Sequence, residues 1–170
     1  MRRPSVPSPM TLADRTRPEL VIPSLRGSDA ASVIQELSLV MHRAGAIPDL
    51  LPFYHKAFNR ELTVSSVLEA GIALPHARVA AVNEPIYSLG RSMRPMPWGA
   101  PAGHSVRLVF LIAIPEGDST RYLHLVSALA RLAGTPSLVE QILTAENAMA
   151  MLDSLESISV PGTVAPPPMH

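Results

Sequence analysis

The apolar run that decides the fold is VRLVFLIAIP, residues 106–115. Apart from Arg107 it carries no charge, which is typical of a strand buried on both faces of a sheet. A second strand is expected at 85–92, and a short edge strand at 19–25 because Pro23 cannot donate to a ladder. Apolar side chains at helical spacing predict helices over residues 29–43, 48–59, 119–132, 136–144 and 146–156. Helices before, between and after buried strands predict an α/β sandwich.

Composition narrows the class of protein. The 170 residues fit one domain, and the hydrophobic content of 47% supports a packed core. Fourteen basic residues balance fourteen acidic ones, which argues against a nucleic-acid partner or an anionic-membrane surface. The absence of cysteine removes disulfides and thiol nucleophiles, and it fits a cytoplasmic location. No apolar segment approaches the roughly 18 residues of a membrane helix, so direct membrane insertion is not expected.

Both ends of the chain are expected to be flexible tails. Residues 1–18 are rich in Pro, Arg and Ser, and residues 157–170 end in three consecutive prolines before Met169 and His170. Neither segment has the apolar content to bury much surface. The folded domain is therefore expected to span residues 19–156.

The stretch RELTVSSVLEAGIALPHARV, residues 60–79, holds the histidine with the most restricted surroundings. Pro75 fixes the backbone just before His76, and the small Ala77 after it leaves the ring accessible. A neutral imidazole is a nucleophile that can attack phosphorus without a strong base. Phosphoryl transfer also needs positive charge and donors around three oxygens, which Arg60 and His124 could supply if the fold brings them to His76. Residue type alone favours the plainer interpretation, in which His76 and His124 are core histidines bonded to the backbone.

Residues 60–79 resemble the active-site signature of the phosphotransferase-system (PTS) enzyme IIA family of the fructose, mannitol and nitrogen-regulatory type. That signature has an Arg-Glu pair, a Ser/Thr pair, a Gly-containing turn and then G-I-A-[IL]-P-H. Three further segments resemble family motifs in the same order: PMPWGAPAGHSVRLVFLIAIPE around the apolar strand, YLHLVSALARL in the helix with the second family histidine, and TAENAMAMLDSL in the closing helix. The resemblance covers residues 19–155.

The resemblance implies a mixed β-sheet sandwiched by helices on both sides and the role of a cytoplasmic, bacterial phosphohistidine carrier, a transferase without a cofactor. His76 matches the phosphorylated histidine, His124 the second histidine against the phosphoryl site, and Arg60 the arginine near it. The implied donor is the histidine-containing phosphocarrier HPr or its nitrogen-system counterpart. The implied acceptor is an enzyme IIB in sugar transport or a regulated target protein in nitrogen regulation. The segment LPHARV is more similar to the nitrogen-regulatory branch than to fused sugar permeases.

One departure from the family pattern lies in the loop before His76. Many members have S-T-G-I-G-x-G there, whereas residues 65–71 are SSVLEAG, so Val67 and Glu69 replace two glycines. If these positions need a positive φ, Val67 is costly and the loop must differ. Glu69 would also bring a carboxylate near a site meant for a dianion. The alternative function is therefore a degenerate IIA-like regulatory binding module without phosphotransfer.

Two other function classes find no support in the motifs. The chain has no H-x-H, H-x-x-H or H-E-x-x-H spacing, so a metal-dependent enzyme is not expected. It also has no G-x-x-x-x-G-K-[ST] loop, which argues against ATP-driven kinase chemistry.

Overall fold

A mixed β-sheet forms the middle layer of the computed structural model, which describes residues 9–99, 103–117 and 119–161. Six strands are present in this described part, in the order β1-β5-β6-β3-β2, and β4 also pairs with β6. β6 is antiparallel to β5 and parallel to β3 and β4. The strands are β1 (Val21–Ile22), β2 (Val67–Leu68), β3 (Ile72–Ala73), β4 (His76–Val79), β5 (Ile86–Trp98) and β6 (His104–Pro115).

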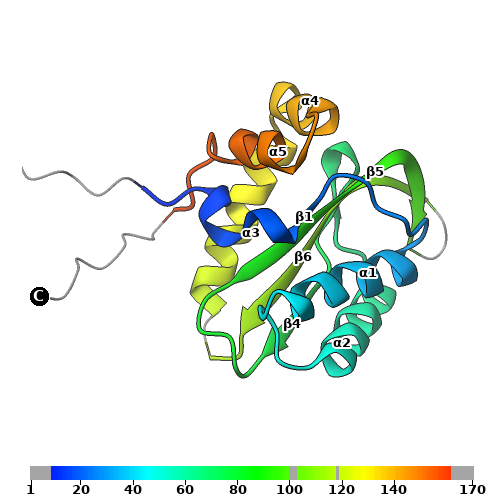
Figure 1. Ribbon diagram of the computed structural model, residues 1–170, viewed down its shortest axis with the longest axis vertical. Helices are drawn as coiled ribbons and strands as arrows, with labels where there is room; N and C mark the ends of the chain where they lie inside the picture. Colours follow the sequence, from blue (N-terminus) through cyan, green and yellow to red (C-terminus); the bar gives the residue numbers. More distant parts are fainter. Residues whose placement is uncertain (1–8, 100–102, 118, 162–170) are drawn as a thin grey trace, which may run out of the picture.

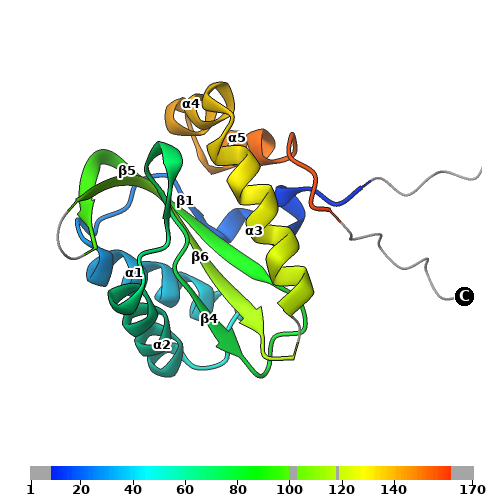
Figure 2. The ribbon, with the colours of Figure 1, turned by 180° about the vertical axis from the view of Figure 1, so that it is seen from behind.

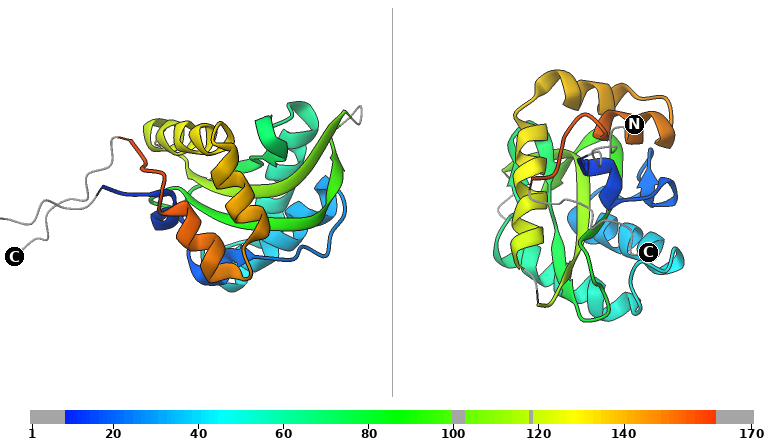
Figure 3. Two further views of the ribbon diagram at one scale, coloured as in Figure 1. Left: turned by 90° about the horizontal axis from the view of Figure 1, so that it is seen from above. Right: turned by 90° about the vertical axis from the view of Figure 1, so that its left-hand side faces the viewer.

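Helices cover both faces of this sheet (Figures 1 and 2). α1 (Ala30–Arg43) and α2 (Leu50–Thr63) lie on one face, and α3 (Ser119–Ala133), α4 (Pro136–Thr144) and α5 (Ala148–Leu155) pack on the other. The edge-on view in Figure 3 shows the sheet between α3 and the helices of the opposite face. The predicted α/β fold, a mixed sheet sandwiched by helices, is confirmed. None of the described helices is long and apolar enough to cross a bilayer.

β6 separates two hydrophobic cores. Val109 and Leu111 pack under α1 and α2, whereas Phe110 and Ile112 pack under α3, α4 and α5. Successive side chains of a strand point to opposite faces, so an almost uncharged run is what a strand between two helical layers requires. The sequence-based expectation that this strand is buried on both faces is therefore correct.

The helix boundaries follow local signals closely in two places. Asp29 caps α1 by accepting from the Ser32 backbone N–H at 2.8 Å, and Gly45 ends that segment with a φ of 74°. α4 begins at Pro136, which has no N–H to leave unpaired in the first turn. α2 runs past its predicted end at residue 59 to Thr63, and this extension places Arg60 in its last turn.

β5 is longer than predicted. It continues from Ile86 to Trp98, beyond residue 92 where the predicted strand ends, through a stretch that contains Pro95 and Pro97. Its pairing with β6 is irregular between Arg91 and Met96, and this irregularity accommodates Pro95, which cannot donate to the ladder. The connection between β5 and β6 includes residues 100–102, which lie outside the described residues.

The predicted flexible tails, residues 1–18 and 157–170, require a correction where the structure describes them. Leu12, in the 3-10 helix η1 (Leu12–Arg15), is fully buried in the core under α3. Its N–H donates to the Ile158 carbonyl at 2.9 Å, and the Val160 N–H donates to the Met10 carbonyl at 2.8 Å. The two predicted tails therefore hold each other against the domain by contacts that are remote in sequence. Residues 1–8 and 162–170 lie outside the described part.

The loop before His76 does not have a positive φ at either of the two positions, Val67 and Glu69, where a family glycine is missing. Positive φ falls on Ala70 (61°) and Gly71 (70°), while Val67 lies in the extended strand β2. Glu69 is exposed at the start of the 3-10 helix η3 (Glu69–Gly71). A Cβ on Gly71 would lie 3.0 Å from the Ser105 carbonyl oxygen, so glycine is required there. The conformational strain in this loop falls on Ala70.

Replacing Ala70 with glycine should therefore stabilise the fold by about 0.5–1 kcal/mol, because glycine adopts a positive φ without the steric cost that a Cβ carries. Urea unfolding followed by tryptophan fluorescence measures this change. Val67→Gly is the matched control in the same loop, and it should destabilise because its backbone is extended. A lower free energy of unfolding for Ala70→Gly would contradict the assignment of strain to this residue.

Candidate functional site

His76 lies where one edge of the sheet meets both helical layers. It is the first residue of β4, a strand whose described pairing partner is β6. Ala77 and Val79 of β4 belong to the core under α1 and α2. Because side chains alternate along a strand, His76 and Arg78 point to the opposite side, toward α3. Figure 2 shows β4 at this edge, with α2 beside it and α3 crossing the sheet above.

A cleft of about 440 Å³ opens at His76. Its wall combines one imidazole, one phenol and three cationic side chains with small or apolar residues. The lining residues are Lys56, Arg60, His76, Ala77, Arg78, Ile114 and Tyr122. His76 itself is half-buried, so its ring has support on one side and access to solvent on the other.

The hydrogen bonds of His76 distinguish its two ring nitrogens. Nδ1 lies 3.0 Å from the Leu74 carbonyl oxygen. A carbonyl only accepts, so Nδ1 must carry the proton in this contact. In the neutral ring Nε2 is then the nitrogen with a free lone pair. The backbone therefore selects the tautomer in which Nε2 is the nucleophilic atom.

Tyr122 of α3 faces that nitrogen. Its hydroxyl lies 3.4 Å from His76 Nε2, and the two ring centroids are 5.2 Å apart with an interplanar angle of 38°. Burial raises the pKa of the Tyr122 phenol, and the nearby guanidinium groups of Arg60 and Arg78 act in the opposite direction. The net shift is upward, so the hydroxyl keeps its proton and remains a donor directed at Nε2.

The cations of the cleft come from two elements. Lys56 and Arg60 are one turn apart on α2, and Arg78 follows His76 by two residues on β4. Arg78 contacts the carbonyls of Pro115 and Glu116 at 3.4 Å. Within the described residues, no ion pair joins these three cations to a carboxylate. The cleft therefore holds uncompensated positive charge beside a nucleophilic nitrogen.

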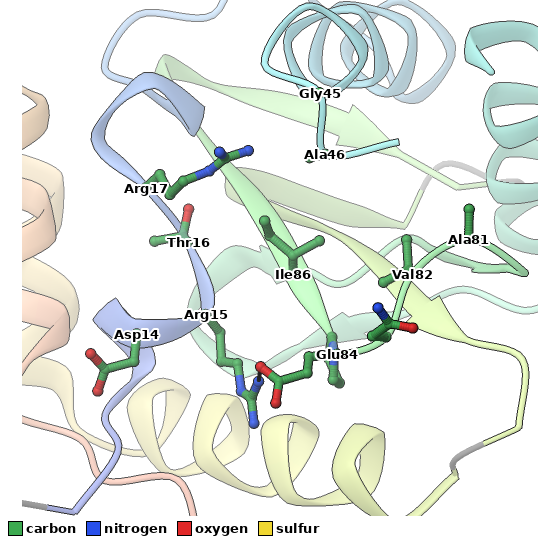
Figure 4. Close-up of a pocket in the computed structure, with 12 residues that line it drawn as sticks. Asp14, Arg15, Thr16, Arg17, Gly45, Ala46, Ala81, Val82, Glu84 and Ile86 are labelled. Carbon is green, nitrogen blue, oxygen red and sulfur yellow. Dashed lines mark hydrogen bonds and ion pairs between the residues drawn. The ribbon is translucent and has the colours of Figure 1, made fainter. Parts of the chain in front are cut away.

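A second cavity, of about 430 Å³, has a different character (Figure 4). Arg15 reaches Glu84 across it at 3.0 Å, and Arg17 donates to the Ala44 carbonyl at 3.1 Å. Its cations are thus already engaged by groups of the protein. No cluster of three potential metal ligands occurs among the residues that the structure describes. The His76 cleft is therefore the candidate functional site.

The structure brings Arg60 and His76 to one cleft but does not place His124 there. Tyr122 and His124 are two residues apart on α3, which separates their side chains by roughly 200° around the helix. His124 is half-buried on the other side, and its Nδ1 is buried without a hydrogen-bond partner in the described part of the chain. Sequence reasoning missed Tyr122. The helical spacing of buried Leu125 and Leu129, three and seven residues later, was the signal that could have found it.

With this geometry established, comparison with known proteins identifies the family. The chain belongs to the EIIA 2 family of the phosphoenolpyruvate-dependent sugar phosphotransferase system, whose model matches residues 16–158. It is 32% identical over 130 residues to the fructose-specific EIIABC component of Bacillus subtilis, covering 76% of this chain and 20% of that protein. The chain thus spans about a fifth of that relative. It is also 24% identical to the nitrogen regulatory protein of Bradyrhizobium diazoefficiens, covering 86% and 95% of the two chains.

Solved structures show the same fold. The nitrogen regulatory protein IIA-Ntr from Neisseria meningitidis superposes with a TM-score of 0.74 at 24% identity, over 85% of this chain and 98% of that one. Enzyme IIA of the mannitol system from Escherichia coli, solved in complex with phosphorylated enzyme IIB, gives a TM-score of 0.70 at 15% identity, over 82% and 95%.

The charges of the cleft can be tested through Tyr122. Arg60→Met should raise the pKa of the Tyr122 phenol further, because it removes a positive charge that favours the phenolate. An NMR pH titration of the labelled tyrosine Cζ measures this directly. Arg26→Met, in the exposed loop before α1, is the matched control and should leave the Tyr122 titration unchanged. An unchanged titration in Arg60→Met would mean that Arg60 does not face Tyr122.

Proposed function

We propose that this chain is a phosphohistidine carrier that accepts a phosphoryl group on Nε2 of His76 and passes it to a second protein. The observation that carries the proposal is the contact of His76 Nδ1 with the Leu74 carbonyl, which leaves Nε2 of the neutral ring as the nitrogen with the lone pair in a cleft with three cationic side chains. Neutral imidazole nitrogens attack phosphorus, and a phosphoryl group in transfer needs surrounding cations and donors. Membership of the EIIA 2 family supports the same reaction class.

In the proposed reaction the donor is a phosphohistidine of an HPr-like protein. The Nε2 lone pair of His76 forms a bond to phosphorus while the donor's P–N bond breaks and its electron pair returns to the donor ring. The proton on His76 Nδ1 stays in place, hydrogen-bonded to the Leu74 carbonyl. The product ring carries phosphorus on one nitrogen and a proton on the other. This cationic ring is a good leaving group, which suits onward transfer.

The residues around His76 would bind the phosphoryl oxygens through their N–H and O–H groups. Arg60 presents a planar fork of N–H groups that suits two phosphoryl oxygens, while Lys56 and Arg78 contribute charge. The Tyr122 hydroxyl, already directed at Nε2, donates to the group bound there. Tyr122 thus takes the position beside the phosphoryl group that the sequence comparison had assigned to His124.

The partners follow from the chemistry and from the relatives. The donor is HPr or its nitrogen-system counterpart, and the acceptor is an enzyme IIB or a regulated target protein. Relatives include both a fructose-specific EIIABC component of the phosphotransferase system and a nitrogen regulatory protein, which supports keeping both kinds of acceptor in the proposal. The alternative of a binding module without phosphotransfer rested on Val67 and Glu69. Since neither has a positive φ nor lines the cleft, transfer is the function we propose.

His76→Ala should abolish labelling. Incubation of the wild-type chain with phosphoenolpyruvate, enzyme I and HPr should add one acid-labile phosphoryl group, seen by intact mass. The variant lacks the nucleophile and should gain none. His55→Ala, on the exposed surface of α2, is the matched histidine control and should be labelled like the wild type. Labelling that persists in His76→Ala would move the acceptor to another residue.

Tyr122→Phe should slow transfer by about tenfold, because it removes one hydrogen bond to a charged group while keeping the ring. His124→Gln should slow transfer by less than about twofold, because its side chain points away from the cleft. Rapid-quench measurement of the phosphorylation rate compares the two. A larger decrease in rate for His124→Gln than for Tyr122→Phe would mean that His124, and not Tyr122, assists the transfer.

A further inference from the structure

Glu61 is a buried carboxylate whose oxygens accept from neutral donors. It is 4% exposed and follows Arg60 in the last turn of α2. No ion pair to Glu61 is found among the described residues. Burying a carboxylate is costly unless donors satisfy its oxygens. Three do so: Trp98 Nε1 and the Ser66 backbone N–H donate to Oε1 at 2.7 and 3.0 Å, and the Ser66 hydroxyl donates to Oε2 at 2.7 Å.

This arrangement fixes the direction of the Ser66 hydroxyl. A hydroxyl has one hydrogen, and a carboxylate only accepts, so the hydrogen of Ser66 points to Glu61. The lone pairs of Ser66 Oγ are then available on the other side. There the Leu74 backbone N–H donates to Ser66 Oγ at 2.9 Å, and it makes a second, longer contact with the Ser66 carbonyl oxygen at 3.3 Å. Glu61 thereby orients the group that holds the Leu74 peptide.

Leu74 transmits this constraint to the imidazole. Its side chain is 4% exposed, its N–H is held by Ser66, and its carbonyl oxygen accepts from His76 Nδ1 at 3.0 Å. Leu74 therefore connects the two groups, because its N–H binds the Ser66 hydroxyl and its carbonyl binds the His76 ring. A continuous series of hydrogen bonds runs from Trp98 through Glu61, Ser66 and Leu74 to the ring of His76.

We propose that Glu61 is a positioning residue that holds His76 in its Nδ1–H tautomer through Ser66 and Leu74. It does not touch the reacting atoms. The part of the proposal that concerns transfer rate rests on the proposed function, whereas the part that concerns the tautomer does not. Without the Ser66 hydroxyl the Leu74 N–H would keep only its longer contact with the Ser66 carbonyl. This looser peptide would allow the His76 ring to rotate and to populate the tautomer with the proton on Nε2, which is not nucleophilic at that atom.

Ser66→Ala tests the series at its middle, because it removes the bridging hydroxyl and leaves the buried carboxylate with its other two donors. Long-range ¹H–¹⁵N NMR of His76 reports the tautomer in the wild type and the variant. The variant should show a measurable loss of the Nδ1–H form and a transfer rate lower by about fivefold to tenfold. Ser66→Thr retains a hydroxyl and should restore both values.

Ser65→Ala is the matched control, since it removes a neighbouring hydroxyl that contacts only the Val67 N–H, at 3.4 Å, in the described bonds. It should leave the tautomer and the rate as in the wild type. Glu61→Gln, nearly equal in volume, should also reduce the population of the Nδ1–H form of His76. If Ser66→Ala does not fold, this variant tests the positioning role in its place.

An unchanged His76 tautomer in the folded Ser66 or Glu61 variant would overturn the positioning role. This result is distinguishable from failure of the proposed function, because absence of phosphorylation in the wild type leaves the NMR measurement intact. A shifted tautomer in Ser65→Ala as large as that in Ser66→Ala would also overturn the proposal, since the effect would then not pass through the Ser66 hydroxyl.

Discussion

The register of residues 72–79 along β6 is the constraint on which the site depends. Ile72 lies opposite Leu108 and His76 lies opposite Ile112, so β3 and β4 keep the same offset. Pro75 offers no donor between them, but its carbonyl still accepts from the Ile112 N–H at 2.9 Å. A slip of one residue would turn His76 into the core under α1 and α2 and would place Ala77 toward α3. Two apolar cores on opposite faces of the sheet prevent that slip.

Sequence patterns predicted the parts of the fold that depend on neighbours in the chain. The almost uncharged run of β6 and the starts of α1 and α4 are local signals, and each lies where it was expected. The errors concern contacts between distant segments. Leu12 is buried because residues 10–12 pair with residues 158–160, and no local pattern reports such a pairing. β5 continues past Pro95 because β6 offers it a partner, which overrides the tendency of its own residues to form a loop.

The site was predicted as far as motif and residue type allow. Arg60 and His76 share a motif, and the helix and strand that carry them bring them to one cleft. Tyr122 and His124 are two residues apart on α3. The rotation of α3 about its axis therefore determines which of the two side chains faces His76. That rotation is set by Leu125, Leu129 and the other side chains that α3 buries. The family resemblance favoured the histidine, whereas packing places the tyrosine beside His76.

The three cations around His76 give the two states of a carrier different long-range fields. With a neutral imidazole, Lys56, Arg60 and Arg78 make the cleft strongly positive. A bound phosphoryl group brings about two negative charges, while the ring that carries it gains one positive charge, so the net positive charge of the cleft falls by about one. An acidic surface would therefore be drawn more strongly to the empty form than to the loaded form, over a screening distance of roughly 8 Å. On the proposed function, a partner can thus distinguish the empty carrier from the loaded one before any atom of the ring is touched.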